Sequence, residues 1–237
     1  MTKIQIYFKS IAGKEKKQNQ DFYFWKKNVH QQILLGIADG VGSYENSYSL
    51  GKIVSQILQK NFIEQNFENL TKEQVKNWLK NIIEIKIHKE IKKISEKAAT
   101  TLSIVILDEN KSYLCHIGNT RIYQFDKARN KTFCLTQDHE FHKQSEDTFS
   151  WMKGEKFLTN SISNTSNCYI DVEEIQLKPG YLILTTDGMH DFIDQHFIYQ
   201  TLSNKEYTEK EKIELLFEKS RFAGSLDDIT CLLAKIN

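Results

Sequence analysis

Proline and arginine are scarce in this 237-residue chain, which has one proline, Pro179, and only three arginines among its 32 basic residues. Because arginine supplies the planar fork that clamps phosphate and carboxylate groups, such clamps must be few. The formal net charge is +1, so nothing attracts the chain as a whole to nucleic acid or to an anionic membrane. We therefore expect neither as a partner.

Cysteine pairs and long apolar runs are also missing. The four cysteines, at 115, 134, 168 and 231, form no CxxC pair, which argues against a zinc knuckle and against a thioredoxin-like motif. No apolar run approaches the length needed to span a bilayer. Residues 1–10 alternate as a half-buried strand does, unlike a signal peptide. These absences predict a cytoplasmic protein whose cysteines stay reduced.

What the chain does contain is an ordinary globular composition, with 40% hydrophobic and 27% charged residues. No Pro- or Gly-rich linker, low-complexity tract or fixed-period repeat divides it. The sequence therefore predicts one domain over residues 1–237, large enough for a sizeable core.

Apolar periodicity predicts the order of the elements. Strands are expected at 4–8, 22–25, 33–38, 101–107, 112–117, 121–125, 169–177, 181–186 and 229–236, and helices at 50–62, 71–94 and 208–223. Short turns suggest that the strands within 101–125 form a meander with Gly118 and Asn119 at a hairpin tip, and the polar residues 138–168 suggest a surface excursion. Because strands and helices do not alternate regularly, the pattern favours an α+β fold with helices on antiparallel sheets.

Acidic residues stand at the ends of several of these strands. LLGIADG at 34–40 and LILTTDG at 182–188 both run into an Asp-Gly pair, yet neither is followed by the partner strand that a hairpin requires. Asp227 precedes the last strand, Asp21 precedes FYFW, and Asp191 follows Asp187 by four residues. Any one of these acids can be a simple cap or turn residue. That explanation is poor only when it must account for all five acids at once.

A cluster of such carboxylates needs cations, because like charges raise one another's pKa. Hard divalent ions such as Mg²⁺ and Mn²⁺ take carboxylate, carbonyl and water oxygens as ligands. A glycine after the aspartate lets the backbone approach closely, so the Gly40 carbonyl could be a further ligand. The acids therefore predict a metal site.

Seven motifs carry a family resemblance. They are NQD (19–21), ADGVGS (38–43), ATTL (99–102), HIGNTRIY (116–123), LTQDH (135–139), LILTTDGMHD (182–191) and GSLDDIT (224–230). In this order they resemble the motifs of the metal-dependent serine/threonine protein phosphatases of type 2C, and the short DGVG form looks like the bacterial branch. The resemblance implies an αββα sandwich, two antiparallel sheets flanked by helices, with the metal centre at one edge.

The resemblance also implies roles for individual residues. Asp39 would bridge two Mg²⁺ or Mn²⁺ ions, with Asp187 and Asp227 as further ligands of the first ion and the Gly40 carbonyl as a ligand of the second. Asp21 would hold metal-bound water, and Asp191 would hold water or a third ion. Lys16 stands where the family has a phosphate-binding arginine. A hydroxide bridging the two ions would attack the phosphorus of phosphoserine or phosphothreonine.

The expected partner is a phosphorylated protein, the target of a cognate Ser/Thr kinase, and the expected assembly is a monomer. Residues 138–168 match the family's flap beside the active site. The alternative is a catalytically silent, phosphatase-like binding module. Asn119 stands where the family usually has an aspartate, which puts the third ion in doubt, and Asp228 replaces an asparagine and adds charge near the first ion.

One further motif and several histidines could also indicate a functional site. CHIGNTR at 115–121 fits the CxxGxxR loop of cysteine-dependent phosphatases, but that loop needs a following helix, and here Arg121 opens an alternating strand. We therefore interpret Cys115 as a strand thiol. Of the histidines, His116 is expected in a sheet, His139 and His142 at the surface or against substrate, and His190 as a residue that could orient water.

Overall fold

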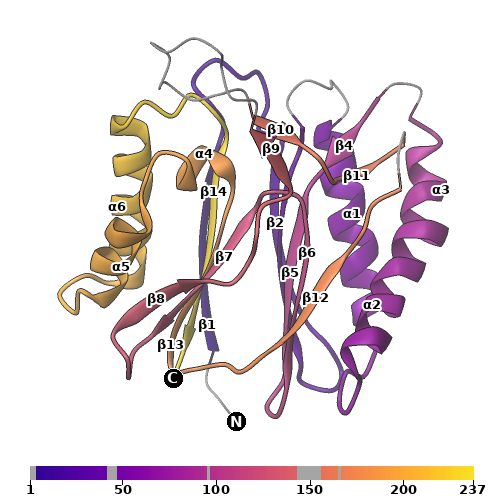
Figure 1. Cartoon of the computed structure of the whole chain (residues 1–237), viewed down its shortest axis with the longest axis horizontal. Helices are drawn as coiled ribbons and strands as arrows, with labels where there is room; N and C mark the ends of the chain where they lie inside the picture. The colour runs from indigo at the N-terminus through magenta and orange to yellow at the C-terminus, as the bar shows by residue number, and fades with distance from the viewer. Residues whose placement is uncertain (1–3, 42–46, 95–96, 143–155, 165–166) are drawn as a thin grey trace.

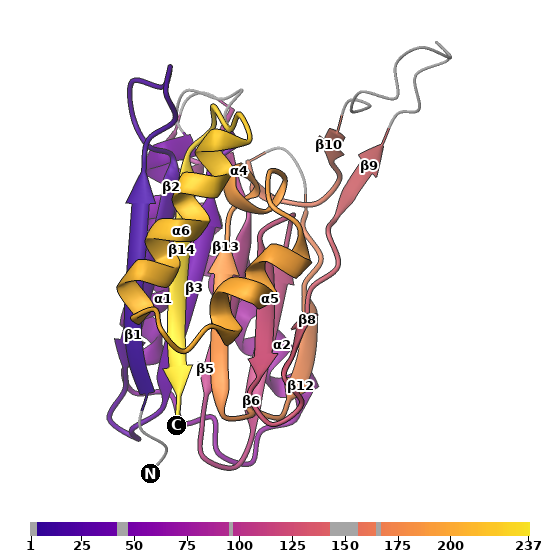
Figure 2. The ribbon, with the colours of Figure 1, turned by 90° about the vertical axis from the view of Figure 1, so that its left-hand side faces the viewer.

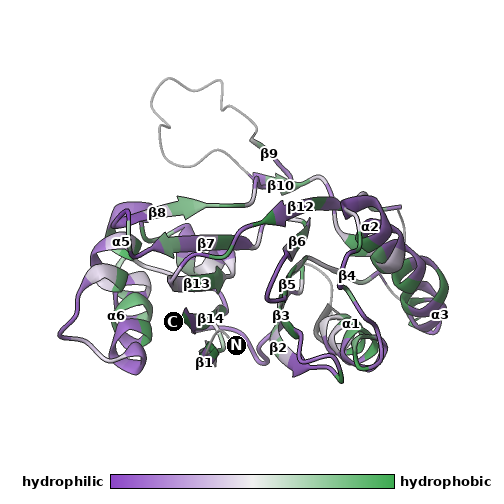
Figure 3. Ribbon diagram, turned by 90° about the horizontal axis from the view of Figure 1, so that it is seen from below, coloured by the Kyte–Doolittle hydropathy of each residue, from purple (hydrophilic) through white to green (hydrophobic). Residues whose placement is uncertain are grey.

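The computed structural model describes residues 4–41, 47–94, 97–142, 156–164 and 167–237. Two five-stranded antiparallel sheets pack face to face, and helices cover the outer face of each (Figure 1). This is the αββα sandwich that the sequence predicts, seen in cross-section in Figure 3.

The first sheet contains the first and the last strand of the chain. Its strand order is β1 (Ile4–Ile11), β14 (Ile229–Ile236), β13 (Gly180–Thr185), β7 (Arg121–Asp126) and β8 (Lys131–Cys134). The helices on its outer face are α5 (Gln195–Ser203) and α6 (Glu209–Phe222), and the one-turn helix α4 (Asp187–His190) follows β13 (Figure 2).

The second sheet has the order β12 (Asp171–Ile175), β6 (Ser112–Ile117), β5 (Leu102–Leu107), β3 (Ile33–Asp39) and β2 (Asp21–Lys27). Its cover consists of α1 (Ser47–Phe62), α2 (Lys72–Asn81), the π-helical η1 (Ile82–Ile87) and α3 (His88–Ile91). Two small pairs complete the described chain: β4 (Ala99–Thr100) with β11 (Ile162–Ser163), and β9 (Glu140–His142) with β10 (Lys156–Leu158).

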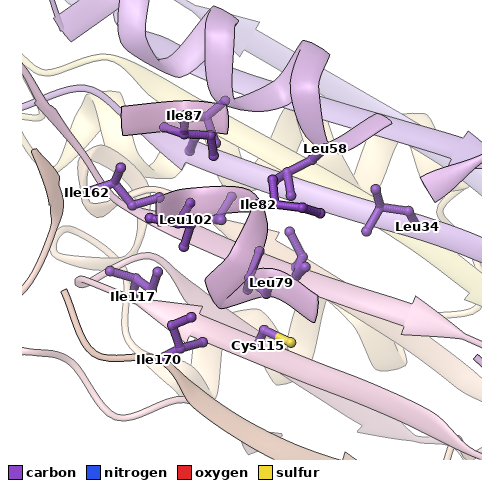
Figure 4. Packing of buried hydrophobic residues seen from close by; sticks show 14 of the residues in the cluster. Leu34, Leu58, Leu79, Ile82, Ile87, Leu102, Cys115, Ile117, Ile162 and Ile170 are labelled. Atoms are coloured by element: carbon purple, nitrogen blue, oxygen red, sulfur yellow. The ribbon is translucent and has the colours of Figure 1, made fainter. Parts of the chain in front are cut away.

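Strand β3 explains how the core positions the site. One of its faces packs between the sheets, where Leu35 and Ile37 are fully buried. The other face packs under the helices, where Leu34 joins Leu58 and Ile82 (Figure 4). A strand buried on both faces has no solvent side to alternate with, so its sequence is a continuous apolar run. Its end, which carries an aspartate, is therefore held rigidly from both sides.

The helix ends follow the local sequence signals. Thr71 with Gln74, and Thr208 with Glu211, form reciprocal capping boxes at the starts of α2 and α6, as predicted. Gly224 follows α6 with a φ of +97° and ends the helix, also as predicted. The helical stretch expected to end near residue 94 has the expected extent, but its middle turn is the π-helix η1 rather than α-helix.

The predicted meander over 101–125 is wrong. Strands β5 and β6 do pair, but β6 has β12 as its other neighbour, whereas β7 lies in the opposite sheet between β13 and β8. Gly118, with a φ of +106°, and Asn119 therefore carry the chain from one sheet to the other and form no hairpin tip. A short turn has the same composition in both cases, so the sequence does not distinguish them.

The excursion at 138–168 is more ordered than expected where it is described. It contains β9, β10 and β11, and β9 and β10 project from the body of the sandwich in Figure 2. All four cysteines are free thiols. Within the described ranges, no helix combines the length and apolarity that a bilayer-spanning segment requires.

Candidate metal centre

Asp21 and Asp39 face each other across the pairing of β2 with β3. Asp21 opens its strand and Asp39 ends the neighbouring one, so both carboxylates lie at the same edge of the second sheet. The backbone of Asp39 is fixed there, because its N–H donates to Thr101 Oγ1 at 2.9 Å and its carbonyl accepts from Thr101 N–H at 2.9 Å. This pairing brings together two of the five acids of the predicted metal site.

Asp187 reaches the same place from the first sheet. Strand β13 ends at Thr185, and Asp187 begins α4. The side-chain hydroxyl of Thr186, between them, donates to Asp21 Oδ2 at 2.8 Å, which joins the two sheets at this edge. The Asp-Gly pair at 187–188 thus starts a helix and closes no hairpin.

Gly188 lets the two acid-bearing segments of the first sheet touch. A Cβ built on Gly188 would lie 1.9 Å from the carbonyl oxygen of Asp228 and 3.3 Å from Asp227 Cβ. Only glycine permits this backbone approach. The contact places Asp187 beside Asp227, and both acids, together with Asp191, line a cavity of about 300 Å³.

Burial and mutual repulsion perturb these carboxylates. Burial and the charges of Asp187, Asp21 and Asp227 raise the pKa of Asp39 well above its ordinary value. Burial is also the main cause that raises the pKa of Asp187 to about 6 and that of Asp21 to about 7, each with a contribution from neighbouring acids. Asp21 Oδ1 is buried and has no hydrogen-bond partner. Such a group of oxygen donors fits a hard divalent cation.

The described side chains are not yet arranged as a finished coordination shell. Across those ranges, no three His, Cys, Asp or Glu side chains converge as metal ligands in their present rotamers. The reason is visible for Asp227, whose carboxylate forms an ion pair with Lys16, and for Asp191, whose carboxylate binds Lys156. The structure thus gathers Asp21, Asp39 and Asp187, and the ligand roles remain predictions.

Lys16 lies in the loop between β1 and β2, and its ammonium contacts Asp227 and lies 3.3 Å from Asp228 Oδ2. Burial alone would lower the pKa of Lys16, but the contact with Asp227 and the charges of Asp228 and Asp39 raise it. Lys16 is therefore a permanent positive charge at the centre of the acids. Its expected role in phosphate binding stays a prediction.

Asp228 has a structural role that the sequence does not reveal. Its side chain is 2% exposed, and its two oxygens accept the backbone N–H groups of Gly13 and Gln20, each at 2.8 Å. These bonds fasten both ends of the loop that carries Lys16 onto the start of β14. The expected extra charge near the first ion is present but is already engaged by these donors.

Asn119 connects the centre to β9. Its side-chain amide donates to Asp187 Oδ2 at 3.3 Å and to Glu140 Oε1 at 2.7 Å. Both carboxylate oxygens of Asp191 accept hydrogen bonds from the ammonium of Lys156 in β10, at 2.6 and 2.7 Å. Glu140 and Lys156 are functional candidates that the sequence did not single out, because each meets its partner only through the fold.

The histidines are structural where they are described. His116 is a buried sheet residue, as predicted. His139 is only 7% exposed, accepts the Gly118 N–H at 3.0 Å and bonds Asp171, so the surface alternative is wrong. It supports the turn that carries Asn119. His190 is buried beside Thr185, at 2.9 Å, and the side chain of His142 lies outside the described residues.

Cys115 is not a nucleophile. It lies within β6 with a 1% exposed side chain, and burial raises its pKa to about 12. The segment after it crosses to strand β7 and starts no helix, so the N-terminal helix dipole of a phosphate loop is missing there. The interpretation of Cys115 as a strand thiol is confirmed, although the hairpin tip assumed next to it is not.

The architecture and the acids at its edge define a two-sheet sandwich with a candidate metal-dependent hydrolase centre. The sequence model of the family described as protein phosphatase 2C matches residues 12–228. The chain belongs to this family, whose members depend on metal ions.

Three bacterial proteins illustrate the similarity. Protein phosphatase PhpP of Streptococcus pneumoniae is 24% identical over 99% of this chain and 98% of its own length. The serine/threonine phosphatase of S. agalactiae has a TM-score of 0.85 with 21% identity, covering 99% of this chain and 100% of that one. The serine/threonine phosphatase Stp1 of Staphylococcus aureus has a TM-score of 0.81, with 21% identity over 100% and 96%. At these identities the structures show the common fold.

Proposed function

We propose that this protein hydrolyses phosphoserine and phosphothreonine in a phosphorylated protein, with two Mg²⁺ or Mn²⁺ ions as cofactors. The observation that carries the proposal is the meeting of the buried Asp21 and the half-buried Asp39 and Asp187 from opposite sheets, in a member of a metal-dependent family. Uncompensated buried carboxylates are costly, and divalent ions are the usual remedy.

Asp39 is the proposed shared ligand of the two ions. The proposed further ligands are Asp187 and Asp227 for the first ion and the Gly40 carbonyl for the second. Bound there, such ions supply an activated water and neutralise charge on phosphoryl oxygens. Asp21 supports the centre through its pairing with Asp39, its bond from Thr186 and its remaining buried oxygen. For Asp227, this role requires its carboxylate to leave Lys16.

Lys16 is the proposed phosphate-binding residue. If Asp227 held an ion, the Lys16 ammonium would lose its ion-pair partner and could contact an oxygen of the phosphoryl group. A lysine offers a point charge where an arginine would offer a two-pronged contact, so phosphate binding depends on charge more than on shape.

We expect Lys16→Met to raise the KM for a phosphothreonine peptide roughly 10-fold and to lower kcat/KM roughly 100-fold, because the ammonium stabilises charge that is largest in the transition state. Steady-state kinetics at saturating Mn²⁺ measures both values. Lys16→Arg keeps the charge and should retain most of the activity. Unchanged kinetics in Lys16→Met would assign the lysine to ion pairing with Asp227 alone.

The wider setting is part of the same proposal. We expect residues 1–237 to act as one catalytic domain, as a monomer in the cytoplasm, on a target of a cognate Ser/Thr kinase. The four free thiols are consistent with a reducing compartment.

The test is metal dependence. With Mn²⁺, the protein should hydrolyse p-nitrophenyl phosphate and a phosphothreonine peptide, and excess EDTA should reduce turnover to the uncatalysed level because the acids alone supply no activated water. Re-addition of Mn²⁺ should restore it. The readout is release of nitrophenol and of inorganic phosphate.

A matched variant excludes the cysteine mechanism. Cys115→Ser is nearly isosteric, and it should leave Mn²⁺-dependent turnover unchanged, since Cys115 is buried in β6. No turnover with Mn²⁺ at all would instead favour the silent binding module, and turnover that survives EDTA would overturn the metal-dependent mechanism.

A further inference from the structure

Lys156 places a fixed positive charge next to the candidate metal centre. Its ammonium contacts both oxygens of Asp191, at 2.6 and 2.7 Å, and lies 3.7 Å from Glu140 Oε2. A cation held by both oxygens of one carboxylate and close to a second carboxylate is not a chance surface contact.

Glu140 places a second, buried carboxylate next to this charge. Its side chain is 4% exposed, and such a carboxylate is costly to bury unless positive charge and donors surround it. Asn119 donates one hydrogen bond to it, and Lys156 supplies the nearby charge. The lysine side chain is 32% exposed, so it reaches this position from the solvent side of the cluster.

The side chain of Asn119 presents hydrogen-bond donors, which cannot bind a metal ion, to the carboxylates of Asp187 and Glu140. Its amide NH₂ lies between Asp187 Oδ2 and Glu140 Oε1, and a group placed between two carboxylates must present its donors to them. A neutral donor therefore lies where the family's usual aspartate would present a ligand oxygen. The backbone bond from Asp191 N–H to the Asp187 carbonyl, at 3.0 Å, ties the lysine's partner directly to the centre.

We infer that the ammonium of Lys156 takes the place of a third metal ion, so that this chain binds two divalent ions and no third. Asp191 then neutralises the lysine and is not a metal ligand, and Lys156 is a positioning residue that couples β10 to the centre through Asp191. The inference rests on the proposed function, because it presupposes that Asp39, Asp187 and Asp227 bind the other two ions.

Counting bound ions tests this directly. Titration of the full chain with Mn²⁺, with free Mn²⁺ followed by electron paramagnetic resonance, should give two ions per wild-type chain. Lys156→Met removes the cation that both oxygens of Asp191 contact, so it should give three, the third more weakly held. Lys156→Arg keeps the charge and should give two. Lys72→Met, which breaks an exposed ion pair between α2 and Glu173 of β12, is the control and should also give two.

Either of two results overturns the inference: three ions on the wild-type chain, or two on Lys156→Met. If Lys156→Met does not fold, Asp191→Asn decides the question. Its count should stay at two with unchanged affinities, whereas a fall from three to two would mean that Asp191 binds an ion. Two bound ions without turnover would contradict the proposed function and leave this inference standing, and no bound ion would contradict both.

Discussion

Asp39→Asn will lose roughly 10³-fold or more in Mn²⁺-dependent turnover while gaining stability in the absence of metal. The loss follows because Asp39 is the proposed shared ligand, and metal ions contribute several kcal/mol to stabilising a phosphoryl transition state. The gain follows because Asn keeps the shape of Asp and removes one charge from beside Asp187, Asp21 and Asp227, which repel it. Activity and stability should therefore change in opposite directions.

The stability gain has a defined sign with pH. In the folded chain the pKa values of Asp21 and Asp187 are raised to about 7 and about 6, from 3.8. The folded state then binds more protons than the unfolded state over this range, so these acids lower the free energy of unfolding as pH rises from about 4 to 7. Asn at position 39 weakens that slope, because it removes one source of repulsion.

Two buried histidines act in the opposite direction. Burial lowers the pKa of His116 to about 4 and lowers that of His190 well below 6.5. The unfolded chain protonates these groups first as pH falls, so they add stability as pH rises to about 6.5. The useful quantity is therefore the difference between wild type and variant, in which the histidine contributions cancel.

Thermal unfolding in EDTA at pH 4.5 and pH 7 measures this difference. We expect Asp39→Asn to be more stable by roughly 1–2 kcal/mol at pH 7 and by less at pH 4.5, on the scale of one pKa step. Asp138→Asn, which breaks the ion pair with Arg121, is a control expected to destabilise the chain. Equal stabilities of wild type and Asp39→Asn at pH 7 would show that the acids do not repel one another.

The fold was predictable where the signal is local. Continuous apolar runs identify strands that are buried on both sides, and β3 has such a run because both of its faces are covered. Capping boxes involve residues three apart, so Thr71 and Thr208 mark helix starts without any tertiary information. Helix α5 also begins with a local signal, since Asp194 caps it by accepting the Phe197 N–H.

The partition of strands between sheets was not predictable in this way. The turn at Gly118 and Asn119 joins two strands that look like hairpin partners, and their separation depends on β12 and β13, which lie more than fifty residues later in the chain. Pairing over such distances leaves no trace in the local pattern.

The residues of the candidate site also differ in whether a local sequence signal identifies them. The aspartates could be predicted because each directly adjoins an apolar strand, and strand ends meet at sheet edges. The roles of Asp228, Glu140 and Lys156 could not, because each depends on a contact with a residue distant in sequence: Asp228 with Gly13, for example, and Lys156 with Asp191. Such residues set which cations the aspartates can accept, so local sequence identifies the acids better than the number of ions.

Gly188→Ala should be the most damaging single-methyl change at the centre. Helix propensity alone favours alanine in α4 by about 1 kcal/mol. The added Cβ would lie 1.9 Å from the Asp228 carbonyl oxygen, which is backbone and cannot rotate away. The segments that carry Asp187 and Asp227 must therefore separate. We expect a loss of roughly 3 kcal/mol in the free energy of unfolding and a roughly 100-fold loss in turnover from displaced groups.

Chemical denaturation in EDTA and Mn²⁺ titration measure the two effects separately. Gly224→Ala is the matched control: nothing lies within 4 Å of its added Cβ, but its φ of +97° is unfavourable for alanine. It should cost about 1–2 kcal/mol through the backbone alone and leave Mn²⁺ affinity unchanged. If Gly188→Ala loses stability but keeps wild-type Mn²⁺ affinity, then the contact between the two segments supports the fold without setting the distance between Asp187 and Asp227, and the proposed pairing of these ligands on one ion is wrong.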